Sequence, residues 1–111
     1  MKTSEVLKKA RAVIEKPENW TKGHYARDAD GRPVSPLHSS AICFCALGAI
    51  RRAALLSGDG SGYAAALHNA SCIKHGADVH MVNDDDNTTH ADVLAIFDEA
   101  ISNAETSEQV A

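Results

Sequence analysis

The apolar segment at residues 43–50, which reads CFCALGAI, most constrains what this chain can fold into. Its side chains are mostly small, so other segments can approach its backbone closely. Gly48 in its middle costs a helix about 1 kcal/mol relative to Ala, and close contact with another backbone would offset that cost. We therefore predict that this segment opens a helix at the centre of a small domain.

This second helix is predicted to run from a cap at Ser39 or Ser40 to about Ser57. Its apolar residues cover a wide face, as expected for a helix that is contacted on several sides. The predicted inward face comprises Ile42, Cys45, Ala46, Ala49, Ile50, Ala53 and Leu56. Arg51 and Arg52 mark the beginning of its solvent face.

Three further segments show signals of a helix. Residues 3–16 carry an apolar stripe at helical spacing, with Thr3 or Ser4 as the expected cap and Pro17 as the stop. Residues 63–75 are alanine-rich and are closed by Gly76. The last helix follows a capping box at residues 89–92 and is predicted to fray from residue 105.

The connections between these helices are predicted to be a hairpin, a short extended piece and a loop. Residues 23–34 contain the turn sequence DADG and are predicted to form a β-hairpin or a hairpin-like loop. Val79, Met81 and Val82 are predicted to be extended. Asp84 to Asp86 are predicted to form a solvated loop, because they do not fit the spacing of a calcium-binding loop.

Together these segments predict one domain over residues 1–104. The fold class is α+β, mostly α, with four helices around a central second helix and one β-hairpin. Its 111 residues suffice for a single hydrophobic core. Trp20 is expected to bury its ring against the first helix and so anchor the hairpin.

Charge and hydropathy remove several classes of function. The formal net charge is −4 and no basic block is present, so we do not expect a nucleic-acid partner. No apolar run approaches the ~18 residues of a membrane span, and no signal peptide is expected. The odd number of cysteines, Cys43, Cys45 and Cys72, predicts free thiols in a reducing, cytoplasmic compartment.

One candidate chemistry is a thiol hydrolase. A cysteine in the first turns of a helix can have a lowered thiol pKa, and Cys45 with His80 or His90 would supply a nucleophile and a base. Asn83 or Asp84 could orient the histidine. The alternative is a structural role in the hydrophobic core, since free cysteine is among the most buried residue types.

A second candidate chemistry is a zinc module. His68, Cys72 and His75 are spaced i, i+4 and i+7, which places them on one face of the predicted third helix. No CxxC or HExxH motif and no phosphate-binding loop accompanies them. The alternative is two exposed histidines beside a semi-buried thiol, and we expect no metal and no cofactor.

Several strings of the sequence together resemble a family of small phage, prophage and bacterial proteins of unknown function. The resemblance covers roughly residues 5–103 and implies a stand-alone domain without an established activity. It rests on Trp20, the hairpin string YARDADGRPV at 25–34, the helix string CALGAI at 45–50, Asn83-Asp84, and the helix at 89–101.

The resemblance also suggests how the loop at Asn83-Asp84 is used. We expect it to pack against the start of the second helix, where Asn83 or Asp84 would bond free backbone donors near residues 40–43. A functional version of this arrangement places a small ligand in the same crevice, beside Tyr25.

These observations favour a non-enzymatic accessory or protein-interaction domain of phage or mobile-element type. The partner is expected to be a protein, because aromatic and arginine side chains are preferred anchors of interfaces. The oligomeric state is left open. The predicted binding residues are Trp20, His24, Tyr25, Arg27, Asn83 and Asp84. The cysteine-dependent hydrolase and the zinc module remain the alternatives.

Overall fold

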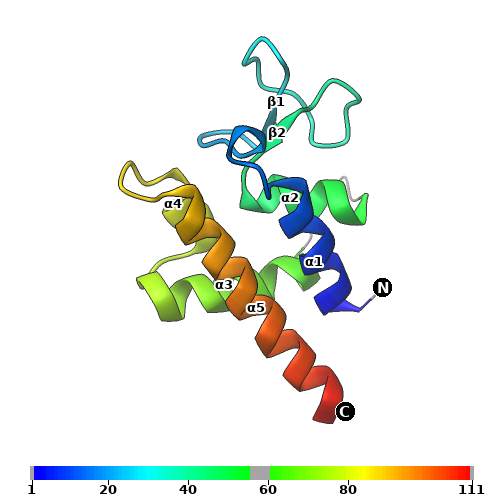
Figure 1. Ribbon diagram of the computed structural model, residues 1–111, viewed down its shortest axis with the longest axis vertical. Helices are drawn as coiled ribbons and strands as arrows, with labels where there is room; N and C mark the ends of the chain where they lie inside the picture. Colours follow the sequence, from blue (N-terminus) through cyan, green and yellow to red (C-terminus); the bar gives the residue numbers. More distant parts are fainter. Residues whose placement is uncertain (1, 56–60, 111) are drawn as a thin grey trace.

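The computed structural model describes residues 2–55 and 61–110, which form five α-helices and a two-stranded sheet (Figure 1). This confirms the prediction of a mostly helical α+β fold. The elements are α1 (Thr3–Val13), the 3-10 turn η1 (Pro17–Asn19), β1 (Ala26–Arg27), β2 (Cys43–Phe44), α2 (Ala46–Ala54), α3 (Ser61–His75), α4 (Val79–Asp84) and α5 (His90–Val110).

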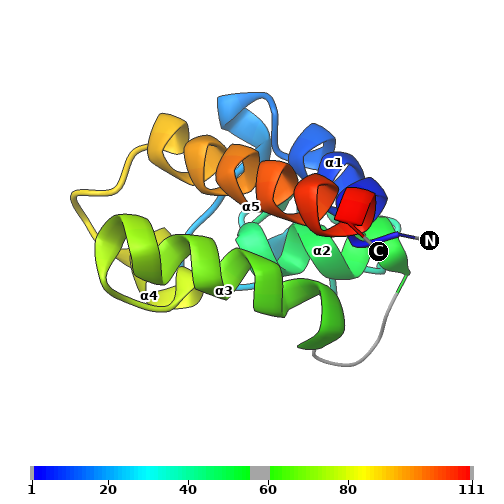
Figure 2. The ribbon, with the colours of Figure 1, turned by 90° about the horizontal axis from the view of Figure 1, so that it is seen from below.

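The longest helix, α5, lies between α1 and α3 and packs against both (Figure 2). Helix α2 contacts α1, α3 and α4, which gives it the central place that its wide apolar face predicted. The sheet and its loops sit at one end of the molecule, beyond α2 (Figure 1). No helix in the described part of the chain has the length and hydrophobicity that crossing a membrane requires.

The core is built from the apolar stripe that the sequence predicted for the first helix and from a similar stripe on the last helix. Side chains from α1 and α5 meet those of α2 and α3 in one continuous cluster. The stripes consist of Val6, Leu7, Ala10 and Ile14 on the first helix and Val93, Ile96, Phe97 and Ala100 on the last, all buried. The capping box is also present, because Thr89 and Asp92 exchange hydrogen bonds between side chain and backbone at 2.9 and 3.2 Å.

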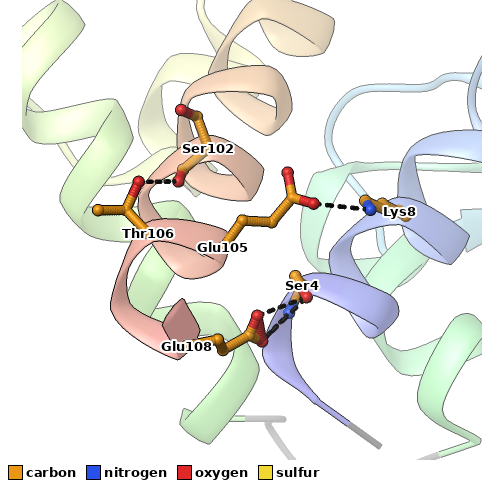
Figure 3. Close-up of polar contacts among 6 residues, drawn as sticks. All are labelled: Ser4, Lys8, Ser102, Glu105, Thr106 and Glu108. Atoms are coloured by element: carbon orange, nitrogen blue, oxygen red, sulfur yellow. Dashed lines mark hydrogen bonds and ion pairs between the residues drawn. The ribbon is translucent and has the colours of Figure 1, made fainter. Parts of the chain in front are cut away.

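Polar contacts tie the two ends of the chain together (Figure 3). The Ser4 hydroxyl donates to both carboxylate oxygens of Glu108, at 2.9 and 2.7 Å, and these bonds lower the pKa of that carboxyl. Lys8 pairs with Glu105 at 2.9 Å. We expected residues 105–111 to fray, but α5 continues to Val110 because these contacts hold it against α1.

The same contacts account for a correction at the start of α1. Thr3 or Ser4 was predicted to cap this helix, and both residues are inside it. The N-cap position is Lys2, which makes no side-chain capping bond. The hydroxyl of Ser4 bonds to Glu108 instead, and the side chain is buried.

Helix α2 starts later than predicted. The expected caps, Ser39 and Ser40, lie in a turn, and α2 begins at Ala46 with Cys45 as its N-cap. The Cys45 sulfur accepts a hydrogen bond from the backbone N–H of Gly48 at 3.3 Å. Strand β2 occupies the positions that were predicted to be the first helical turn, since its backbone bonds to β1.

This shift also moves the predicted inward face. Ile42 was expected to be buried, but it precedes β2 and is 50% exposed. Ala46, Ala49 and Ile50 are buried as predicted, whereas Leu56 and Ser57 lie outside the described residues. The helical prediction was therefore correct from Ala46 to Ala54 and wrong before it, and Leu55, in the left-handed conformation, ends the helix before the predicted Ser57.

The turn of the predicted hairpin is present. Its first strand, β1, pairs mainly with a later segment of the chain, β2. Asp28 N–H donates to the Arg32 carbonyl at 2.9 Å, and Val34 N–H donates to the Ala26 carbonyl at 3.1 Å, which closes the turn. The antiparallel ladder of β1 runs to β2, with Ala26 opposite Phe44. The strand signal of residues 43–44 was hidden within the segment predicted as helix.

Helix α4 replaces the extended piece that was predicted at residues 79–82. Val79, Val82 and Asn83 are buried at the i, i+3 and i+4 positions of one helical face. The alternation of Val79 and Met81 suggested a strand, but Met81 is 59% exposed. Burial of three side chains on one helical face outweighs the weak β-propensity of such a short run.

Gly48 explains why α2 must carry a glycine. A Cβ atom at Gly48 would lie 1.9 Å from the Tyr25 carbonyl oxygen and 2.8 Å from its carbonyl carbon. The backbone of Tyr25 therefore lies directly on α2, as the sequence predicted for some neighbouring segment. The Cys45 N–H donates to the same Tyr25 carbonyl at 3.2 Å.

We predict that Gly48→Ala lowers the free energy of unfolding by about 1–3 kcal/mol, the usual cost of overpacking a close contact. The clash with a backbone atom outweighs the gain of about 1 kcal/mol in helix propensity. Urea denaturation followed by circular dichroism measures the difference. Gly62→Ala in α3 is the matched control, because no heavy atom of the described residues lies within 4 Å of the methyl group that this change adds. Equal stability of Gly48→Ala and wild type would contradict the close approach.

Candidate functional site

A pocket of about 520 Å³ lies between residues 23–25, the start of α2, helix α3 and helix α4. We call it the α2–α4 pocket. It gathers four of the predicted binding residues, namely His24, Tyr25, Asn83 and Asp84. Its size falls within the range that is usual for small-molecule sites.

Asn83 is one of the residues that line the pocket, and its side chain joins three segments of the chain through hydrogen bonds. Its side chain is 1% exposed, and its Oδ1 atom accepts hydrogen bonds from the Trp20 indole N–H at 2.8 Å and the Ala46 backbone N–H at 3.0 Å. Its Nδ2 atom donates to the Thr21 carbonyl at 3.1 Å and to Asp84 Oδ1 at 3.0 Å. Two accepted and two donated bonds satisfy this amide completely.

The predicted contact between the Asn83-Asp84 segment and the second helix is therefore present, at a later position than expected. Asn83 bonds to the first residue of α2, Ala46, rather than to residues 40–43. Asp84 adds a second link, because its Oδ1 atom accepts the Gly23 N–H at 2.9 Å. These bonds fix residues 20–23 against both α2 and α4.

Cys45 lines the α2–α4 pocket and is 8% exposed. Burial raises the pKa of its thiol, and the charge of Asp84 raises it further, while the N–H groups of Gly48 and Leu47 lower it. The net direction is upward, so the thiol is protonated at neutral pH. A protonated thiol is a poor nucleophile.

His80 and His90, the two candidate bases of the hydrolase hypothesis, lie in different parts of the structure. His80 lines the pocket together with His68, and their rings are 6.4 Å apart in an edge-on arrangement. The Nδ1 atom of His68 accepts the Val79 backbone N–H at 3.4 Å. His90 is outside the pocket, where its Nε2 atom lies 2.6 Å from the Ile14 carbonyl and its ring is 5.9 Å from that of Trp20.

Trp20 and Arg27 also lie outside the pocket, and their polar groups are used within the chain. The Trp20 ring is half-buried against the core, as expected for an anchor. The Arg27 guanidinium donates to Thr21 Oγ1 at 3.1 Å, to the Gly31 carbonyl at 2.9 Å and to the Lys22 carbonyl at 3.2 Å. These bonds close the loop around β1, so we assign both side chains a structural role.

The zinc hypothesis receives no geometric support. No group of three His, Cys, Asp or Glu side chains in the described ranges is arranged to hold a metal ion. Cys72 lies beside Asp78, with Sγ 3.8 Å from Oδ1, while His68 is bonded to the start of α4. The shared helical spacing of His68, Cys72 and His75 does not bring them together at one point.

Sequence reasoning missed Asp78 as a residue of the pocket. Asp78 is the N-cap position of α4 and lines the α2–α4 pocket. An Asp shortly after Gly76 and before an apolar residue is a helix-start signal. The prediction of an extended piece at residues 79–82 concealed it.

We predict that Asn83→Asp lowers the free energy of unfolding by about 3 kcal/mol at neutral pH, because a buried carboxylate would face the Thr21 carbonyl and Asp84 in place of a donor. The loss should shrink as the pH falls, since protonation restores a donor. Thermal and urea denaturation at several pH values measure the difference from wild type. Asn69→Asp, on α3 and away from this junction, is the control with the same change in charge. A loss no larger than that of Asn69→Asp would rule out the role of Asn83.

We predict that iodoacetamide labels exposed Cys72 of the folded protein readily and leaves Cys45 unlabelled until denaturant is added. Low exposure and the raised thiol pKa both reduce the amount of accessible thiolate. Peptide mapping by mass spectrometry resolves the sites, and Cys72 is the internal control. Labelling of Cys45 at the rate of Cys72 would move the hydrolase hypothesis to first place.

Comparisons with known proteins place the chain in a family without giving it an activity. No curated protein and no solved structure matches it significantly. The model of a family of unknown function, DUF6197, matches residues 1–103, which is nearly the whole chain. The chain therefore belongs to the family of unknown function DUF6197.

Proposed function

We propose that this protein is a small non-enzymatic accessory domain that works by binding, and that its binding site is the α2–α4 pocket. The observation that supports this most is the convergence of polar side chains from four segments on one cavity of about 520 Å³. Pockets of this size with a few well-placed polar groups are the usual sites of ligand recognition. The proposal does not depend on the phage or mobile-element origin that the sequence resemblance implied.

The pocket is formed before any ligand arrives. Asn83 is fully bonded and buried, and it fixes residues 20–21, the start of α2 and the end of α4 relative to one another. A site whose walls are already positioned loses less entropy on binding. This rigidity favours recognition of a defined ligand over nonspecific contact.

The predicted protein-interaction surface is thereby reduced to the residues that line the α2–α4 pocket. Trp20 and Arg27 are engaged within the chain, whereas His24 and Tyr25 are exposed and line the pocket. Tyr25 is 44% exposed. A partner that contacts this face would meet the pocket first.

A cysteine-dependent activity is the second candidate, because Cys45, His68 and His80 line one pocket. It ranks second for a physical reason. The Cys45 sulfur is buried, its thiol pKa is raised, and it accepts the Gly48 N–H as the cap of α2. These properties suit a structural thiol better than a nucleophile.

A screen of small polar fragments by ¹⁵N–¹H NMR tests the binding proposal. We expect fragments to shift the amide resonances of Gly23, Leu47 and His80, and we expect His80→Trp to weaken that binding at least about tenfold by filling the pocket. Met81→Trp is the control, since Met81 is the adjacent exposed residue of α4 and does not line this pocket. Shifts confined to other surfaces, or equal binding by both variants, would refute the proposal.

A further inference from the structure

We infer that the α2–α4 pocket selects a ligand that carries an organic cation, either a protonated amine or a guanidinium group. This inference rests on the proposed binding function and adds the chemical class of the ligand. It depends on which hydrogen-bonding groups the pocket has left over once the contacts within the chain are made.

The start of α2 has few free donors for a ligand. A helix N-terminus ordinarily favours anions through its free backbone N–H groups. Here the Ala46 N–H is bonded to Asn83 Oδ1 at 3.0 Å, and the Gly48 N–H is bonded to Cys45 Sγ at 3.3 Å. The Leu47 N–H also acts on the same sulfur, because it lowers the thiol pKa. An anion would have to displace these internal acceptors.

Backbone N–H groups at the other walls of the pocket are also bonded within the chain. The Gly23 N–H is bonded to Asp84 Oδ1 at 2.9 Å, and the Val79 N–H at the start of α4 is bonded to His68 Nδ1 at 3.4 Å. Both amides are therefore satisfied by side chains of the pocket itself. The internal bonds use up donors from three segments that border the cavity.

Acceptors, in contrast, remain available. Asp78 and Asp84 line the pocket, and no lysine or arginine among the described residues lines it with them. Neither carboxylate forms an ion pair within the described ranges. The imidazoles of His24 and His80 also line the pocket and are weak acceptors when neutral.

The Asp84 carboxylate is the stronger of the two charged groups that act on the Cys45 thiol. Burial is the largest cause of the raised pKa of the Cys45 thiol; of the two charges, Asp84 raises that pKa more than Arg51 lowers it. The Tyr25 ring also lines the pocket. The Arg51 guanidinium lies 4.0 Å from the centre of the Tyr25 ring, so one face of this ring already holds a cation of the chain itself.

Two sources could present this cation. It could be a free small amine, or it could be a lysine or arginine side chain of a partner protein that enters the pocket beside His24 and Tyr25. Both present the same chemistry to Asp78 and Asp84. The pocket volume of about 520 Å³ leaves room for an alkyl stem next to Leu47.

NMR titration of the full chain with four matched probes tests the inference. The probes are n-butylammonium, n-butylguanidinium, butan-1-ol and butyrate, which share an alkyl stem and differ in charge. We expect the two cations to shift the resonances of Gly23, Leu47 and His80, and we expect butan-1-ol and butyrate to bind at least about tenfold more weakly. Added salt should weaken the binding of the two cations and leave the binding of butan-1-ol unchanged.

Charge-neutral variants supply the second arm. Asp84→Asn keeps an acceptor oxygen for the Gly23 N–H, so the fold is preserved while the charge is lost. We expect about fivefold weaker binding of n-butylammonium by Asp84→Asn and by Asp78→Asn, and no change for Asp30→Asn, which makes the same change in net charge in the distant hairpin turn.

The outcomes separate this inference from the proposed function. Shifts of the pocket resonances by butan-1-ol or butyrate as strong as those by the cations would overturn the cation class and leave the binding function standing. If neither the four probes nor the fragments shift the resonances of the pocket residues, both the cation class and the binding function are overturned. With the cation class confirmed, tighter binding of Nα-acetyl-lysine methylamide than of n-butylammonium identifies a partner side chain, and weaker binding identifies a free amine.

Discussion

The side-chain amide of Asn83 is the contact on which the rest of this structure depends. One buried oxygen receives the indole N–H of Trp20 and the first N–H of α2, and the amide nitrogen donates to the Thr21 carbonyl. Loss of such a group leaves several buried donors without partners, each at a cost of about 1–3 kcal/mol. Segments more than 60 residues apart in the chain are thereby joined through a single residue.

The same junction decides the chemistry of the α2–α4 pocket. Since Asn83, Cys45, Asp84 and His68 satisfy backbone donors around the cavity, the polar groups left at its walls are mainly carboxylates and imidazoles. The thiol that the sequence offers as a nucleophile is used as a helix cap. The features that looked catalytic in the sequence are thus better explained as the frame of the α2–α4 pocket.

Much of the fold could be predicted because the helices carry regular apolar stripes. Val6, Leu7 and Ala10 on α1 and Ile96 and Phe97 on α5 are buried where their spacing places them. The close approach at Gly48 could also be inferred, since a central glycine costs helix stability unless something packs on it. The nearness of Asn83 to the second helix followed from the resemblance to other proteins.

The errors have a common physical cause, which is that tertiary pairing decides the state of short segments. Residues 43–44 pair with β1 and so cannot form the first turn of α2, and residues 79–84 bury one helical face that local alternation disguised. The division of the histidines, with His80 in the pocket and His90 beside Trp20, depends on the packing of α4 and α5, which the spacing of residues alone does not reveal.

Hydrogen exchange of the Trp20 indole N–H and the Ala46 amide N–H, followed by NMR, is the sharpest test of the junction at Asn83. Both groups donate to the same buried oxygen of Asn83, so we expect both to exchange slowly and with the same free energy of opening. An indole N–H that exchanges at the rate of free tryptophan while the Ala46 amide stays protected would contradict this expectation.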